Sequence, residues 1–264
     1  MSFQAKLYYI REFLFPRGCA CCGEALLSEE EAFYGLCAEC KNTFISEIIS
    51  ERRCCICGKP LISEKECCLS CRDDEGNIKL RYNEKIERIR MIFSYSGKYK
   101  KILGAYKFKK NIAVGNFFTY CFNSILKDLF NEGFLTENNQ PNNISGLAWV
   151  PVPPRPGKIK KQGWDQIEFL AKLLKNESKD SGGDTCFLPV SKCLKRLPSR
   201  SQKELNREER NSNLKKRILC VKKPPKVAIL FDDVITTGAT LEACTSALLE
   251  GGTERVFGIC LFFD

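Results

Sequence analysis

The residues with the clearest chemical potential in this sequence are cysteines in closely spaced pairs. A two-residue gap turns both sulfurs toward one ion, and two such pairs complete the tetrahedral four-thiolate set of a structural zinc site. Gly23 and Gly58 directly follow a pair, where the backbone must take a conformation that glycine tolerates best. We therefore predict two zinc sites, joined sequentially in preference to interleaved, with these ligands: Cys19, Cys22, Cys37, Cys40, Cys54, Cys57, Cys68 and Cys71.

Paired cysteines also occur in disulfide frameworks and in redox centres. Disulfides are typical of exported domains, but the first 16 residues are interrupted by Lys6, Arg11 and Glu12 and do not form the apolar core of a signal peptide. We predict a short amphipathic helix there and the cytoplasm as the compartment. A redox centre needs an exposed thiol of low pKa, and four tandem pairs exceed that need. A closed four-thiolate site has no open coordination position, so its zinc is expected to stabilise a small fold.

A second pattern, KVAILFDDVITTGATLEACTSALLEGG, runs from Lys226 to Gly252 and combines carboxylates, hydroxyls and a flexible backbone. The apolar run before the two aspartates is typical of a parallel strand that is buried on both faces. The carboxylates can accept hydrogen bonds from vicinal sugar hydroxyls, and the helix that follows offers its N-terminus to a phosphate. The alternative is a structural turn in which Asp233 caps the helix. We predict a ribose 5-phosphate site made by Asp232, Asp233, Thr236, Thr237, Gly238, Ala239 and Thr240.

The elements that must position this site are strands and helices in alternation. We expect strands over Val227 to Phe231, Val256 to Phe262 and from Arg90 to Tyr95. Their order predicts an α/β fold with a doubly wound parallel sheet, in which ligands bind beyond the carboxyl ends of the strands. Cysteine density falls near residue 80, so we predict a double zinc-ribbon-like module over residues 1–80 and an α/β domain over residues 81–264. Polar stretches at 136–145 and 176–184 are predicted as surface loops.

The two predicted parts differ in charge. Residues 1–80 hold 10 basic and 13 acidic side chains, so the positive charge of the chain belongs to residues 81–264. Lys98 to Lys110 contains six basic residues and no acidic one, interleaved with aromatic residues. Such a surface can bind single-stranded nucleic acid, although a solvated face explains a basic run as well. No apolar run reaches the ~18 residues of a membrane span. The absence of histidine excludes histidine metal ligands and Ser-His or Cys-His catalytic sites.

The segment VAILFDDVITTGATL resembles the phosphoribosyl pyrophosphate (PRPP) motif of type I phosphoribosyltransferases. The chain as a whole is similar to the ComF family. This similarity rests on Phe15-Pro16 before the cysteine pairs, Val150-Pro151-Val152-Pro153, Gly163-Trp164-Asp165-Gln166, Arg200-Ser201-Gln202 and the PRPP motif. It implies a cytoplasmic, zinc-binding, phosphoribosyltransferase-like protein, which in naturally competent bacteria serves the uptake of single-stranded DNA.

Two functions follow from this resemblance. The first is transfer of a phosphoribosyl group from PRPP to a nitrogen acceptor with release of pyrophosphate. The alternative is handling of single-stranded DNA together with DNA-uptake proteins, with the PRPP-type site used for binding or regulation. A PRPP-sensing transcription regulator is a weaker hypothesis, because the sequence shows no helix-turn-helix signature.

The resemblance also implies three loops that converge on PRPP, here Pro151 to Lys161, Lys195 to Asn213 and Asp232 to Thr240. Mg²⁺ is expected with the pyrophosphate. Purine phosphoribosyltransferases often place an aspartate base where this chain has Thr236, which cannot take up a proton at neutral pH. We therefore assign no catalytic residue and leave enzyme activity open. A guanidinium grips phosphate oxygens in pairs, so the candidates for pyrophosphate binding are Arg155, Arg200, Arg207 and Arg210.

Overall fold

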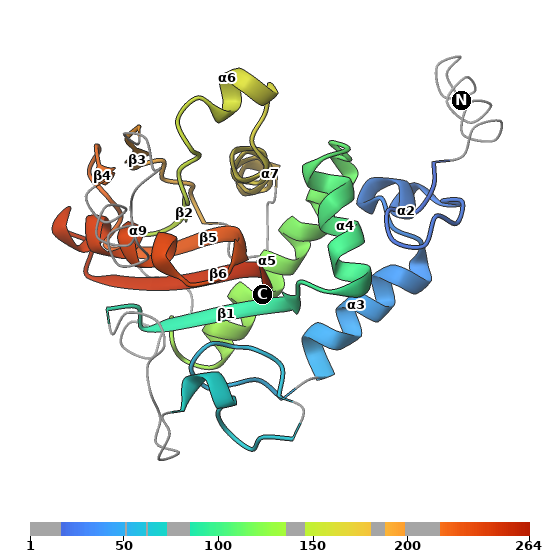
Figure 1. Cartoon of the computed structure of the whole chain (residues 1–264), viewed down its shortest axis with the longest axis horizontal. Helices are drawn as coiled ribbons and strands as arrows, with labels where there is room; N and C mark the ends of the chain where they lie inside the picture. Colours follow the sequence, from blue (N-terminus) through green and yellow to red (C-terminus); the bar gives the residue numbers. More distant parts are fainter. Residues whose placement is uncertain are drawn as a thin grey trace, which may run out of the picture. The chain divides into compact units, whose positions relative to one another are not determined.

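The structure is a computed structural model of the 264-residue chain. It describes residues 17–50, 52–61, 63–72, 85–135, 146–180, 188–198 and 217–264 (Figure 1). The helix predicted at the N-terminus and the loop predicted over 136–145 lie outside these residues. By packing, the chain divides into one unit of residues 1–51 and 95–120 and another of residues 52–94 and 121–264. The sequence boundary near residue 80 does not coincide with this division and stays a prediction.

The first unit is helical and holds the first two cysteine pairs. Its helices are α2 (Glu29–Tyr34), α3 (Ala38–Ser50), α4 (Gly97–Lys107) and the first part of α5 (Ala113–Asn131). Aromatic rings form its core: Phe44 lies 5.3 Å from Tyr99 and 5.7 Å from Phe117 between ring centroids. Tyr106 of α4 is fully buried, so the apolar face of this basic helix packs inward, while Lys100 and Lys101 are exposed.

The second unit is built on a parallel sheet. Its strands are β1 (Arg88–Ser94), β2 (Leu147–Pro151), β5 (Val227–Ile235) and β6 (Arg255–Phe263), in the order β1-β6-β5-β2. All three pairings between neighbours are parallel. A small antiparallel ladder joins β3 (Leu194–Arg196) to β4 (Ile218–Cys220). The remaining helices are α6 (Lys158–Gln162), α7 (Gln166–Asp180), α9 (Ala239–Glu250) and the 3₁₀ turn η1 (Leu69–Cys71).

Helices cover both faces of this sheet, as the alternation of side chains along a strand requires. On one face, Phe231 of β5 packs against Phe122 of α5, with 5.4 Å between the ring centroids. On the other, Leu230 belongs to the same buried cluster as Leu241 and Leu248 of α9. The predicted α/β fold with a parallel central sheet is therefore confirmed. Among the described residues, no helix combines the length and the apolar character needed to cross a membrane.

Two boundaries differ from the sequence prediction by more than two residues. Strand β5 continues to Ile235, so both aspartates lie within the strand and do not follow it. The reason is the length of β6, whose Cys260 and Phe262 still pair with Asp232 and Val234. The loop predicted over 176–184 was wrong in its first half, because α7 runs to Asp180. Residues 176–180 contain neither glycine nor proline, so nothing local stops the helix there.

Candidate functional site

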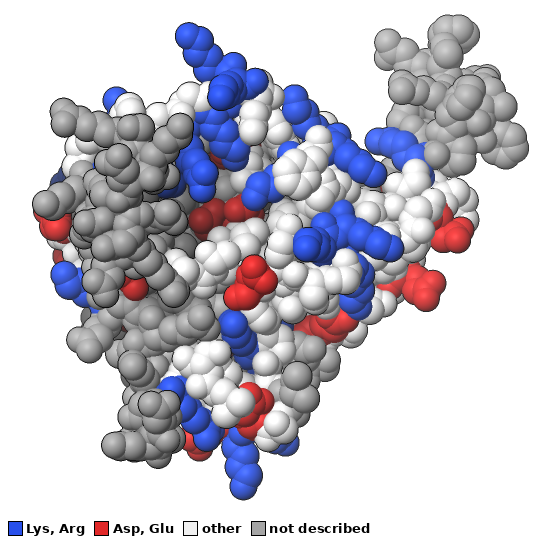
Figure 2. All heavy atoms as spheres, in the orientation of Figure 1, with Lys and Arg blue, Asp and Glu red and all other residues white. Residues whose placement is uncertain are grey.

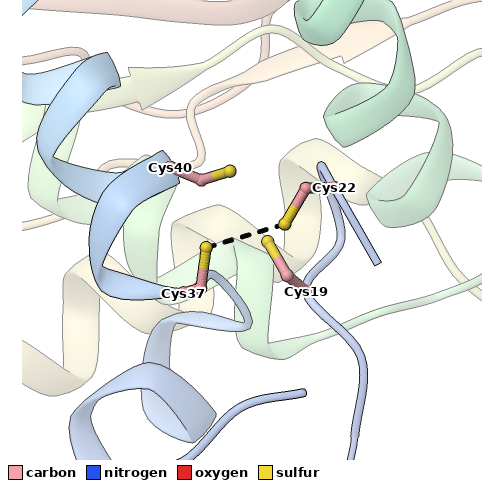
Figure 3. Close-up of side chains that lie close together, drawn as sticks. All are labelled: Cys19, Cys22, Cys37 and Cys40. Carbon is pink, nitrogen blue, oxygen red and sulfur yellow. Dashed lines mark hydrogen bonds between the residues drawn. The ribbon is translucent and has the colours of Figure 1, made fainter. Parts of the chain in front are cut away.

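The first cysteine cluster lies within the helical unit. The four sulfurs of Cys19, Cys22, Cys37 and Cys40 all lie within 4.8 Å of one another and are turned toward a common centre (Figure 3). The sulfurs of Cys22 and Cys37 are 3.6 Å apart. Four sulfurs bound to zinc at ~2.3 Å in a tetrahedron would be about 3.8 Å apart. The four residues therefore fit a zinc ion.

The second cluster has the same composition and lies in the unit that carries the sheet. Its sulfurs, from Cys54, Cys57, Cys68 and Cys71, also lie within 4.8 Å of one another, and all four residues are buried. The sulfurs of Cys57 and Cys68 are 3.6 Å apart. The structure thus brings the cysteine pairs together sequentially, the first with the second and the third with the fourth.

The leading pair of each cluster uses the same backbone turn. The N–H of Gly23 donates to the carbonyl of Cys19, and the N–H of Gly58 donates to the carbonyl of Cys54, both at 3.0 Å. Gly23 has a φ of 90° and Gly58 a φ of 70°, a region that other residues rarely adopt. The glycines that follow the pairs are therefore required by the turn, as the sequence predicts.

Electrostatics in each cluster favour one thiolate and raise the pKa of its neighbours, among them Cys37 and Cys40 in the first cluster and Cys57 and Cys71 in the second. Burial works against ionisation of Cys19, but hydrogen bonds from the backbone N–H groups of Cys22, Cys37 and Cys21 lower the pKa of Cys19 to about 7. In the second cluster, hydrogen bonds from the thiols of Cys57 and Cys71 hold the pKa of Cys54 far below its usual range. Zinc binds the deprotonated thiolate, so Cys19 and Cys54 are the ligands that are ready to bind first, and a bound cation would favour loss of the remaining protons.

Two further thiols lie beside the second cluster. The sulfur of Cys67 is 3.6 Å from that of Cys54 and 3.5 Å from that of Cys55. Neither Cys55 nor Cys67 belongs to the set of four sulfurs that lie mutually close. Cys67 is nevertheless near enough to replace Cys54 as a ligand. In the part of the chain that the structure describes, no thiol outside the set of four contacts Cys71 in this way, so loss of Cys71 should not be compensated.

The second cluster packs directly on strand β1. The guanidinium of Arg53 donates through Nη1 to the carbonyl of Gly58 at 3.0 Å and to the carbonyl of Met91 in β1 at 2.9 Å. A methyl group added at Gly58 would lie 2.8 Å from the Cα of Arg90. The turn of the second cluster therefore lies against the backbone of the strand with no room for a side chain.

Gly58→Ala should lower the free energy of unfolding by about 2 kcal/mol or more, because the methyl group meets backbone and φ is positive. Gly133→Ala is the matched control: its φ is 80°, in the same unit, but nothing lies within 4 Å of the added methyl group. Gly133→Ala should lower the free energy of unfolding by only ~1–2 kcal/mol, which is the cost of backbone strain alone. Urea unfolding followed by circular dichroism measures both. Equal losses would contradict close packing at Gly58.

The two aspartates of the predicted sugar-phosphate site have different surroundings. Asp233 is 6% exposed, and its Oδ1 accepts from the N–H of Val234 at 2.9 Å. Asp232 is half-buried, and its Oδ1 accepts from the N–H of Asp233 at 2.8 Å. Neither carboxylate caps α9, whose N-cap residue is Gly238 with a φ of 80°. The structure therefore does not support the alternative of a structural turn in which Asp233 caps the helix.

The segment between β5 and α9 presents hydroxyls and a helix N-terminus. Thr236 and Thr237 are exposed, while Gly238 is buried. Because glycine has no side chain, the N-cap supplies no hydroxyl or carboxylate to the first N–H groups of α9. A 12-residue helix with this N-terminus can bind an anion through its backbone and its dipole.

The two other predicted loops begin beside β5. Pro151, the last residue of β2, pairs with Phe231, and the N–H of Val152 donates to the carbonyl of Phe231 at 3.1 Å. The segment that carries the exposed Arg155 therefore leaves the sheet next to Asp232. Figure 2 shows acidic side chains in a recess of this face, with basic side chains of the α6 region above them. Three candidate arginines lie outside the described residues: Arg200, Arg207 and Arg210.

Arg196 was missed by sequence reasoning, although it lies in the predicted loop Lys195 to Asn213. Burial lowers the pKa of Arg196, and repulsion from Arg155 lowers it further, while Asp232 works in the opposite direction. Arg217 also repels it. Positive charges from β3, from the residue before β4 and from the segment after β2 therefore lie near one another and near Asp232 of β5.

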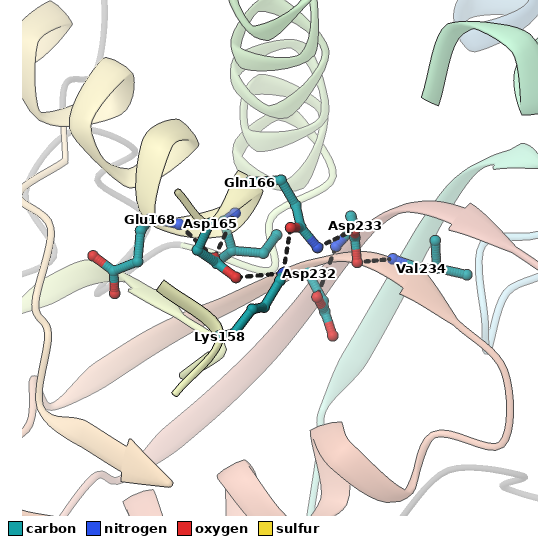
Figure 4. A network of polar contacts seen from close by, with 8 residues as sticks. Lys158, Asp165, Gln166, Glu168, Asp232, Asp233 and Val234 are labelled. Atoms are coloured by element: carbon teal, nitrogen blue, oxygen red, sulfur yellow. Dashed lines mark hydrogen bonds and ion pairs between the residues drawn. The ribbon is translucent and has the colours of Figure 1, made fainter. Parts of the chain in front are cut away.

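A polar network connects α6 and α7 to the aspartates (Figure 4). Lys158 forms an ion pair with Asp165 at 2.5 Å and also donates to the Oε1 of Gln166. The Nε2 of Gln166 donates to Oδ2 of Asp233 at 2.7 Å. Oδ1 of Asp165 accepts from the N–H groups of Ile167 and Glu168, as expected before the first turn of α7. The sequence signal for Asp165 and Gln166 was the Gly-Trp-Asp-Gln run, and Lys158 lies in the predicted loop Pro151 to Lys161.

Comparisons with known proteins bear on the cysteine clusters and on the family resemblance. Residues 10–72 match the family model of the double zinc ribbon domain. Over 222 residues the chain is 28% identical to competence protein ComFC of Streptococcus pneumoniae, and the match covers 84% of each of the two chains. The resemblance to the ComF family is confirmed. The zinc ribbon match spans both cysteine clusters, so structural zinc is confirmed as a cofactor of this ComF-like chain. The eight ligand assignments stay a prediction supported by the geometry.

Proposed function

We propose that this ComF-like chain binds PRPP together with Mg²⁺ at the carboxyl end of β5. The observation that carries the proposal is the gathering of opposite charges there: Asp232 lies on β5, and both Arg155 and Asp232 are close enough to act on the charge of Arg196. Carboxylates suit the vicinal hydroxyls of a ribose, and guanidinium groups suit phosphates. A ligand that carries both groups therefore matches the site better than a sugar or a phosphate alone.

Each part of PRPP has a corresponding feature. The 5-phosphate is assigned to Thr236, Thr237 and the N-terminus of α9, where hydroxyls and backbone N–H groups can donate. The pyrophosphate is assigned to the arginines. Burial and mutual repulsion disfavour the charged form of Arg196, and a bound polyanion would relieve that repulsion. Mg²⁺ would neutralise part of the pyrophosphate charge and be held mainly by phosphate oxygens and water.

The reaction proposed for this site is phosphoribosyl transfer. A nitrogen nucleophile would form a bond to the anomeric carbon of the ribose, and the bond from that carbon to the pyrophosphate oxygen would break. The electron pair leaves with the pyrophosphate, which the arginines would stabilise. Thr236 cannot act as the base, so a nucleophile that needs no base from this position is expected.

Isothermal titration calorimetry of the full chain with PRPP tests the proposal. We expect saturable binding that requires Mg²⁺, weaker binding of ribose 5-phosphate, and no comparable binding of ATP, which presents its ribose in a different relation to its phosphates. Release of pyrophosphate with candidate nitrogen acceptors then tests transfer. Absence of PRPP binding, or equal affinity for any polyphosphate, would overturn the proposal.

We propose a second function, binding of single-stranded DNA in the cytoplasm with DNA-uptake proteins as partners. One specific observation favours it: Phe108 is 76% exposed and stands next to the exposed Lys109 and Lys110. Exposed aromatic rings stack on bases, and lysines bind the backbone. The relative from Streptococcus pneumoniae is named a competence protein, which is consistent with such a role. Tyr106 cannot take part, because it is fully buried.

Phe108→Ala should weaken binding of a labelled oligothymidylate about fivefold or more, because stacking of one base contributes ~1–3 kcal/mol. Replacing both Lys109 and Lys110 by alanine should also flatten the dependence of affinity on salt. Ile112→Ala is the control, since Ile112 is 58% exposed nearby and has no aromatic ring. Fluorescence anisotropy at two salt concentrations gives both quantities. If Phe108→Ala changes nothing or affinity ignores salt, this second function is wrong.

A further inference from the structure

Gln166 connects two opposite charges in the sheet-bearing unit. Its Oε1 accepts from the ammonium of Lys158, and its Nε2 donates to Oδ2 of Asp233 at 2.7 Å (Figure 4). Gln166 and Asp233 are both only 6% exposed. A hydrogen bond to a charged group is stronger in such a setting, and the loss of one partner leaves the other buried without compensation.

An amide is the neutral group suited to this position. It accepts through its oxygen and donates through its nitrogen at the same time, so it can meet a cation on one side and an anion on the other. The ammonium of Lys158 fixes which end of the amide faces which way. A glutamate would offer only acceptors when ionised, and an alanine would offer neither group.

The two aspartates are not equivalent in this arrangement. Both oxygens of Asp233 are engaged within the protein, Oδ1 by the N–H of Val234 and Oδ2 by Gln166. The backbone N–H of Asp233 in turn donates to Oδ1 of Asp232. Asp232 is the more exposed of the two and is the one that acts on the charge of Arg196.

We propose that Gln166 is a positioning residue that acts on the ligand through Asp233, while Asp232 is the acid that meets the ribose hydroxyls. This inference rests on the proposed binding of PRPP. Lys158, from the segment that follows β2, fixes the orientation of the Gln166 amide by donating to its oxygen. The amide fixes the carboxylate of Asp233, and the backbone at Asp233 orients Asp232. Gln166 itself touches no reacting atom.

A double-mutant cycle in the full zinc-loaded chain tests this order of action. Gln166→Ala should weaken PRPP binding about tenfold, as expected when one partner of a buried charged hydrogen bond is lost. Asp233→Ala should weaken it at least as much. The double variant should be no weaker than Asp233→Ala, because Gln166 acts only through that carboxylate. Losses that multiply would overturn the inference, as would a Gln166→Ala variant that binds PRPP normally.

Gln166→Glu gives a readout that a purely structural role would not move. Two facing carboxylates share a proton as the pH falls, because repulsion raises the pKa of one of them. Binding should be about tenfold weaker than wild type at pH 8 and approach wild type near pH 5.5, once the shared proton restores the hydrogen bond. Gln166→Ala should stay weak at both pH values. The other charged or titratable groups around the pair are Lys158, Asp165, Asp232 and the buried thiol of Cys260.

The outcomes separate this inference from the proposed function. A wild-type chain that does not bind PRPP would overturn both. Binding by the wild type, with multiplied losses in the cycle or without recovery of Gln166→Glu at low pH, would overturn the positioning role alone. Circular dichroism and zinc content of each variant confirm that the fold is retained.

Discussion

Cys71→Ser should lower the zinc content of the purified chain from two equivalents to one. Cys71 is one of four buried cysteines whose sulfurs lie within 4.8 Å of one another, and three thiolates cannot close a tetrahedral site. Metal binding supplies folding free energy in small zinc modules, on the order of 10 kcal/mol. The segment around the second cluster should therefore unfold, and become sensitive to a protease, while the first cluster keeps its metal. Elemental analysis and limited proteolysis measure these effects.

Cys55→Ser is the matched control for this experiment. Cys55 lies in the same segment and contacts Cys67 at 3.5 Å, but it is outside the set of four sulfurs. It should keep two equivalents of zinc and wild-type protease resistance. Two equivalents in Cys71→Ser, or a wild-type chain with little zinc and its cysteines in disulfides, would contradict the assignment of ligands.

Asp232→Asn should weaken PRPP binding about a hundredfold without loss of stability. A hydrogen bond to a charged group contributes ~1.5–3 kcal/mol, and the vicinal hydroxyls of a ribose can form two with one carboxylate. Asparagine keeps the shape of the side chain, and Asp232 is only half-buried, so the strand should tolerate the change. Calorimetry with PRPP and Mg²⁺ measures the affinity, and thermal unfolding measures the stability.

Asp264→Asn, which removes the same charge from an exposed position in the same unit, is the control. It should bind PRPP as the wild type does. Equal affinity in Asp232→Asn and the control would mean that the aspartate does not meet the ligand.

The features that sequence predicted well depend on short-range chemistry. Two cysteines that turn toward one ion and a glycine after them form a local pattern, and so do an apolar strand, a hydroxyl-rich turn and a helix. Those elements formed close to where the pattern placed them, although β5 runs past the two aspartates to Ile235. The sequential joining of the cysteine pairs was favoured but not fixed, because it depends on which segments pack together.

The features that sequence missed depend on contacts between distant segments. Gln166 donates a hydrogen bond to the carboxylate of Asp233, 67 positions further along the chain. Nothing in the sequence around Gln166 identifies Asp233 as its partner. Arg196 belongs to a basic stretch in which no single arginine stands out. The longer β5 follows from pairing with β6, and the division into packing units joins residues 95–120 to the first cysteine cluster. The spacing of residues along the sequence does not predict which distant segments come into contact.

The position of the second cluster on β1 has a consequence for the behaviour of the chain without metal. Strand β1 is the outermost strand in the described sheet, with β6 as its neighbour on one side. From the second cluster, Arg53 donates a hydrogen bond to the carbonyl of Met91 in β1, and the turn at Gly58 lies against the backbone of β1 at Arg90. An uncovered edge strand with the sequence RIRMIFS offers free N–H and C=O groups to a second chain. We therefore expect zinc at the second cluster to protect against aggregation as well, and chelation to yield intermolecular β-structure before the sheet itself unfolds.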